Sequence, residues 1–162
     1  MSGKGRSPEP HRPDRLFFLD ECLPKQVGDA LRLVDFPITT ADLEGKCGKG
    51  DSHLIPWLAA DGCVWITKDD EAKRQHLDQI IKCALSIIWV RGIDRQANKV
   101  SPQQLHLMLT NKLLAAKDKL VAAHGPLHFL LYLNGGRPCL EPRDIHGLRQ
   151  KQKRRQKRLK RR

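Results

Sequence analysis

Two stretches decide the fold: Leu16-Phe17-Phe18-Leu19-Asp20-Glu21 and Cys63-Val64-Trp65-Ile66-Thr67-Lys68-Asp69-Asp70. Each is a short, continuous apolar run that ends in acidic residues. Apolar runs of this length are typical of strands that are covered on both faces, as in a parallel sheet. We therefore expect two buried parallel strands with carboxylates at their carboxyl ends.

The rest of the chain alternates between strand-like and helix-like segments. We expect strands at 16–19, 35–39, 63–67, 84–90 and 127–133. We expect helices at 25–34, 51–60, 70–77 and from Ser101 to the Gly125-Pro126 pair. This alternation predicts an α/β fold, namely a three-layer α/β/α sandwich with a mostly parallel central sheet.

Three acids fall where the predicted strands end or a helix starts. Asp20 follows the first strand, Asp69 follows the strand at 63–67, and Asp51 opens the helix between them. Helices in such folds begin at the edge where strands stop, and ligands bind at that edge. Each acid alone also suits a turn or a helix cap: Asp20 a turn, Asp51 and Asp70 a cap. Caps do not explain why acids follow both of the most apolar strands.

Clustered carboxylates repel one another and raise each other's pKa values, unless a cation lies between them. Mg²⁺ and Mn²⁺ prefer oxygen ligands, and Mg²⁺ keeps several waters and leaves room for phosphate. A metal held in this way can polarise a phosphoryl oxygen and activate water. The spacing of the acids therefore predicts a Mg²⁺ or Mn²⁺ site that acts on phosphate esters.

Three residues near these acids each fit two different roles. Thr67 can orient a carboxylate or a water, and Lys68 can neutralise phosphate or simply be solvated. Arg91, at the end of a later strand, can contact a scissile phosphate or form a surface ion pair. The three Trp residues, which lie in apolar segments, are expected in the core rather than as platforms for bases.

The positive charge of the chain is concentrated at its C-terminus. Residues 143–162 hold 11 Lys or Arg and one acid, whereas the remainder holds 19 basic and 17 acidic residues. We expect a disordered lead-in at 1–14, one domain at 15–142 and a disordered polybasic tail at 143–162. The tail can bind nucleic acid, solubilise the chain or contact an acidic partner. The residues expected to contact nucleic acid are Lys151, Lys153, Arg154, Arg155, Lys157 and Arg158.

Cysteine and histidine spacing argues against some classes of protein. The five Cys form no CxxC pair, and the seven His form no HxxxH or HxH pair, so a zinc site is not expected. An odd number of Cys, without a secretion signal or a membrane-spanning apolar run, indicates reduced thiols and a cytoplasmic protein.

Three segments carry a family resemblance: Phe18-Leu19-Asp20-Glu21-Cys22-Leu23-Pro24, Gly50-Asp51 and Val64-Trp65-Ile66-Thr67-Lys68-Asp69-Asp70. In this order they resemble the FLDExLP, D and TKD pattern of PIN-like domains, which include VapC-type toxin ribonucleases of toxin–antitoxin pairs. The resemblance implies a small α/β/α sandwich, metal-dependent RNA cleavage, frequent homodimers and an antitoxin partner. It assigns the metal to Asp20, Asp51 and Asp69, with Glu21 and Asp70 as supporting acids.

The resulting hypothesis is an endoribonuclease that hydrolyses RNA with a metal-activated water and needs no covalent intermediate. A further acid is typical of such sites, and Asp94 is the candidate for it. One rival is a non-catalytic PIN-like module that binds nucleic acid or a partner. Another is a phosphoryl-transfer domain with Asp20 as nucleophile, although no second DxD acid follows that strand.

Overall fold

The computed structural model describes residues 15–134 and 140–160, so the expected lead-in at 1–14 lies outside the described residues. The strands are β1 (Phe17–Leu19), β2 (Ile38–Thr40), β3 (Val64–Thr67), β4 (Ser86–Arg91), β5 (His128–Tyr132) and β6 (Leu140–Pro142). The helices are α1 (Lys25–Arg32), α2 (Asp51–Ala60), α3 (Asp70–Gln75), α4 (Leu77–Lys82), α5 (Ile93–Ala97), α6 (Pro102–Ala122) and α7 (Ile145–Leu159).

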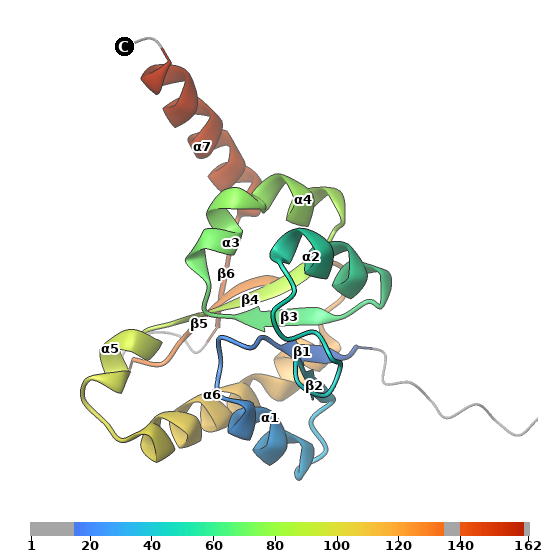
Figure 1. Ribbon diagram of the computed structural model, residues 1–162, viewed down its shortest axis with the longest axis vertical. Coiled ribbons are helices and arrows are strands. Elements are labelled where there is room, and N and C mark those ends of the chain that lie inside the picture. The colour runs from blue at the N-terminus through green and yellow to red at the C-terminus, as the bar shows by residue number, and fades with distance from the viewer. Residues whose placement is uncertain (1–14, 135–139, 161–162) are drawn as a thin grey trace, which may run out of the picture.

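The six strands form one sheet in the order β2-β1-β3-β4-β5-β6. All neighbouring pairs are parallel except β5 and β6, which are antiparallel. Helices α1 and α6 cover one face of the sheet, and α2, α3 and α4 cover the other (Figure 1). The predicted α/β class with a mostly parallel sheet is therefore confirmed.

Side chains of the inner strands alternate between the two faces, as the pleat of a strand requires. Phe17, Leu19, Val64 and Ile66 enter the core beneath α1 and α6. Phe18 and Trp65 enter the core beneath α2 to α4, as does Trp89. Because both faces are covered, each apolar run is buried without a polar position until the strand ends.

The long helix α6 follows its sequence pattern closely. The Ser101 side chain accepts from the Gln104 backbone, and the Gln104 side chain accepts from the Ser101 backbone, which together form a capping box. The expected apolar stripe faces the sheet, with buried residues Leu105, Leu109, Leu113, Ala116 and Leu120. In the part of the chain that the structure describes, none of the helices combines the length and apolar character that a bilayer span needs.

Some expected elements differ in extent. The helix expected at 70–77 is two helices, α3 and α4, because the backbone leaves helical geometry at His76. The strand expected at 84–90 starts only at Ser86, since Ala84 has a φ of 51°. The short elements α5 and β6 were not expected from the sequence pattern; β6 has three residues and ends in Pro142.

The expectation of a disordered tail over 143–162 is wrong for residues 145–159, which form α7. Asp144 caps this helix by accepting a hydrogen bond from Gly147 N at 2.9 Å. Ile145 is buried against the α2–α4 layer, Leu148 packs on it, and Arg149 forms an ion pair with Asp78 of α4. The first two turns are therefore anchored, while the remaining basic turns project from the body (Figure 1).

The close contact between α1 and β2 provides a test of the packing. A Cβ at Gly28 would lie 2.4 Å from Thr40 Cγ2. We expect Gly28→Ala to destabilise the protein by about 1–2 kcal/mol, because overpacking outweighs the better helix propensity of Ala. Urea unfolding measures this change. Gln26→Ala, at an exposed position of the same helix, should shift stability by less than about 0.5 kcal/mol. A more stable Gly28→Ala protein would contradict this packing.

Candidate active site at the carboxyl edge of the sheet

Asp20 lies one residue beyond β1, on the same side of the sheet as Phe18. Its Oδ2 accepts hydrogen bonds from Thr67 Oγ1 at 2.6 Å and Cys22 Sγ at 3.2 Å. Its Oδ1 accepts from Glu21 N at 2.8 Å. Burial raises the pKa of Asp20, and these three hydrogen bonds oppose the rise. A carboxylate has about four acceptor sites, so about one remains for another ligand.

Thr67 links the two strand ends. It is fully buried at the end of β3, and its hydroxyl donates to Asp20 and accepts from Asp69 N at 3.0 Å. Asp69 is the N-cap of α3, where its Oδ1 accepts from Glu71 N at 2.6 Å. The cap role considered for Asp70 therefore belongs to Asp69. One hydroxyl thus fixes Asp20 and the backbone of Asp69 relative to each other.

Asp51 is the first residue of α2, not its cap, and Gly50 occupies the cap position. Within residues 15–134 and 140–160 its carboxylate accepts no hydrogen bond. Burial raises the pKa of Asp51, the charge of Asp69 raises it further, and His76 lowers it. Asp20 and Glu21 also raise this pKa. The charges of Asp69, Asp20 and Glu21 thus disfavour the ionised form of Asp51.

Glu21 connects β1 to the glycine-rich loop before α2. Its Oε2 accepts from Gly48 N at 2.7 Å, although Glu21 itself is exposed. This hydrogen bond holds the loop at 44–50 beside the end of β1, and the loop in turn leads into Asp51. The supporting acid Glu21 therefore positions the segment that delivers the third acid.

The donor types at this edge suit a hard cation, but the side chains do not form a closed ligand set. Among residues 15–134 and 140–160, no three His, Cys, Asp or Glu side chains are grouped to hold one metal ion. Mg²⁺ usually takes one or two protein carboxylates and completes its shell with waters. Asp20, Asp51 and Asp69 are thus chemically suitable ligands.

Cys22 is poorly suited to act as a nucleophile at this site. Burial and the charge of Asp20 raise the pKa of the Cys22 thiol to about 11. A thiol with this pKa stays protonated at neutral pH and is a poor nucleophile. It acts as a hydrogen-bond donor to Asp20, so the acid site favours metal or acid–base chemistry over covalent chemistry at sulfur.

The basic residues Lys68 and Arg91 each have an acidic partner. Arg91, the last residue of β4, forms a close ion pair with Asp70, and both side chains are about one-third exposed. Lys68 Nζ lies 3.0 Å from Oδ1 of Asp94, the candidate further acid. Asp94 is thus exposed and tied to Lys68 beside the acids, whereas Asp70 is tied to Arg91.

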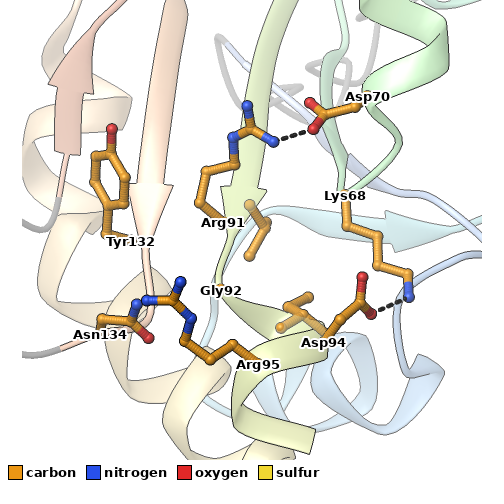
Figure 2. A pocket seen from close by; sticks show the side chains of 10 residues that line it. Lys68, Asp70, Arg91, Gly92, Asp94, Arg95, Tyr132 and Asn134 are labelled. Atoms are coloured by element: carbon orange, nitrogen blue, oxygen red, sulfur yellow. Dashed lines mark hydrogen bonds and ion pairs between the residues drawn. The ribbon is translucent and has the colours of Figure 1, made fainter.

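A pocket of about 500 Å³ opens at the same edge, beside these ion pairs. Figure 2 shows Tyr132 and Asn134 on one wall, Asp70 and Asp94 on the other, and Arg91 between them. Arg95, Tyr132 and Asn134 were not expected as site residues. The sequence did carry a signal for Tyr132, because it is the only Tyr in the chain and lies near the end of the strand predicted at 127–133.

Two of the three Trp residues are core residues, as expected. Trp65 and Trp89 are fully buried. Trp57 is partly buried and lies beneath Lys46 Nζ, 4.4 Å from the ring centroid.

Searches with the chain against protein-family models, curated proteins and solved structures found no match.

The repulsion at Asp51 gives a pH-dependent prediction. A raised pKa means that the folded chain binds the proton more tightly, so ionised Asp51 destabilises the fold above the unfolded pKa of about 3.9. We expect Asp51→Asn to be more stable than wild type at pH 7 in EDTA, and this advantage to vanish as the pH falls towards 4. Urea unfolding of both proteins from pH 4 to 8 measures this difference in stability.

Asp61→Asn, at the other end of α2, is the control and should show no such trend. An equal trend in Asp61→Asn would refute the repulsion at Asp51.

Proposed function

We propose that this chain is a metal-dependent endoribonuclease with a PIN-like active site. The observation that supports the proposal is that the Thr67 hydroxyl links Asp20 to the backbone of Asp69 at one sheet edge, while the Glu21–Gly48 hydrogen bond holds the loop that leads into Asp51 beside the same edge. These acids come from three separate parts of the chain, and they match the three segments of the family resemblance.

The three carboxylates would hold Mg²⁺ or Mn²⁺, with Thr67 fixing the orientation of Asp20. When bound, the cation would polarise the phosphodiester and lower the pKa of an attacking water. Glu21 holds the glycine-rich loop, while Lys68 and Arg91 place positive charge beside the acids. RNA would then lie along this edge with its phosphates facing the cations.

The basic face of α7 is proposed to strengthen RNA binding. Lys151, Lys153, Arg154, Arg155, Lys157 and Arg158 lie in this helix and are exposed. The resemblance also makes the chain a candidate toxin of a cytoplasmic toxin–antitoxin pair. An antitoxin and a second copy of the chain are the partners that this family would imply.

Cleavage of RNA tests the proposal directly. We expect wild type to cut a single-stranded RNA in Mg²⁺ or Mn²⁺, and Asp20→Asn and Asp69→Asn to lose at least about 100-fold in rate. Asn is as good a helix cap as Asp, so Asp69→Asn should keep α3 intact. Gel analysis of time courses, with and without EDTA, gives the rates.

Asp61→Asn is the matched control, because Asp61 is an exposed acid at the C-terminal end of α2. It therefore lies near the amino end of β3, away from the proposed site at the carboxyl ends of the strands. It should cleave at the wild-type rate. Equal cleavage by wild type, Asp20→Asn and Asp69→Asn would remove these acids from the mechanism.

The projecting helix α7 favours a second candidate, a module that binds RNA without cutting it. For single strands each neutralised phosphate contributes about −0.7 to the slope of log affinity against log salt. We expect Lys153→Gln/Lys157→Gln to weaken RNA binding and reduce this slope by roughly 1 to 1.5. Fluorescence anisotropy between 50 and about 200 mM salt measures the slope.

Lys82→Gln/Lys99→Gln removes two exposed charges elsewhere and should leave the slope unchanged. An equal loss in both double variants would show that α7 has no special role. RNA binding through α7 without metal-dependent cleavage by wild type would favour the binding module over the nuclease.

A further inference from the structure

We infer that the pocket beside the acids binds one nucleotide of single-stranded RNA, with its base against the Tyr132 ring and its phosphate near Arg95 (Figure 2). This inference rests on the proposed function, since it places the nucleotide next to the bond to be cut. It adds roles for Arg95 and Tyr132, which the proposed metal site does not use.

The pocket spans the carboxyl ends of three adjacent strands. Arg91 and Tyr132 are register partners on β4 and β5, so their side chains leave the sheet on the same face. Lys68 and Asp70 come from the segment that follows β3. The segment 67–70 thus contributes to both the acid site and the pocket. Thr67 and Asp69 belong to the acid site, while Lys68 and Asp70 line the pocket.

The charges of the pocket favour a phosphate. Three cations, Lys68, Arg91 and Arg95, face two carboxylates, Asp70 and Asp94. Lys68 and Arg91 are each held by one of these carboxylates. Arg95 is exposed and has no acidic partner within the described ranges 15–134 and 140–160, so its guanidinium carries the net positive charge.

The Tyr132 ring provides a fixed aromatic wall. It is partly buried and packs on the core beneath α2 to α4, which limits its motion. Bases of any identity stack on such rings, and each stacked base contributes about 1–3 kcal/mol to binding. A nucleotide has a base that can stack on the Tyr132 ring and a phosphate that can pair with the Arg95 guanidinium. A purely anionic ligand would use only the guanidinium.

The floor of the pocket is closely packed where Gly92 meets Asn134. Gly92 has a φ of 87°, and a Cβ there would lie 2.9 Å from Asn134 Oδ1. That oxygen accepts from Gln96 Nε2 at 2.7 Å, which fixes the Asn134 amide beside Arg95. The volume of about 500 Å³ lies within the usual range for small-molecule sites of about 300–1,000 Å³.

Titration of the full chain with adenosine 5′-monophosphate, followed by amide NMR shifts in EDTA, tests the subsite. We expect the largest shifts at Gly92, Tyr132 and Asn134, and binding about 5- to 100-fold weaker in Tyr132→Ala. Tyr132→Phe keeps the ring and should bind within about twofold of wild type. Arg95→Gln, at an exposed position, should weaken the nucleotide but not adenosine.

Lys82→Gln removes an exposed charge at the opposite edge of the sheet and should bind as wild type does. Inorganic phosphate that shifts the same amides with equal affinity would overturn the nucleotide assignment. So would unchanged binding by folded Tyr132→Ala, with its folding checked by circular dichroism.

The two proposals fail separately. Nucleotide binding at these amides without metal-dependent cleavage would leave the subsite standing and remove the nuclease. Cleavage whose KM is unchanged in Tyr132→Ala and Arg95→Gln would leave the nuclease standing and overturn the subsite.

Discussion

Burial of the sheet on both faces governs where chemistry can occur in this molecule. Phe17 to Leu19 and Val64 to Ile66 have almost no exposed surface, so a charged side chain within these strands would lack water and a partner. The first positions that can be polar are those where the strands stop. Asp20, Thr67, Arg91 and Tyr132 occupy such positions and point to the side of α2 to α4. The acids and the pocket are therefore two consequences of one packing constraint.

Most of the sheet was predictable, because its inner strands contain continuous apolar runs that are typical of buried parallel strands. The capping box and stripe of α6 were equally informative, since Ser101, Gln104 and the buried leucines each have a local cause. The sequence was least informative where tertiary contacts decide. Nothing local marks β6, which has only three residues, ends in Pro142 and is defined by its antiparallel pairing with β5. The charge of α7 predicted disorder, but two apolar residues and one cap outweigh that charge at its start.

The placement of Asp20 and Asp69 at one edge was predictable because parallel strands bring their ends together there, and Thr67 links the two residues. The partners of the individual side chains were not predictable. No spacing rule pairs Arg91 with Asp70, or makes the Cys22 thiol a donor to Asp20. These contacts depend on the rotamers and on the exact stagger of β3 and β4. The influence of His76 on the pKa of Asp51 was missed for the same reason, since His76 lies at the break between α3 and α4.

The reversed direction of β6 sets the distance between the basic helix and the acids. Arg143 N donates to the carbonyl of His128, the first residue of β5, so α7 departs from the opposite edge of the sheet. Five residues of β5 separate the two edges, roughly 16 Å at about 3.3 Å per residue. An RNA that contacts both the acids and α7 must cross this span. Very short oligonucleotides would therefore contact only one of the two.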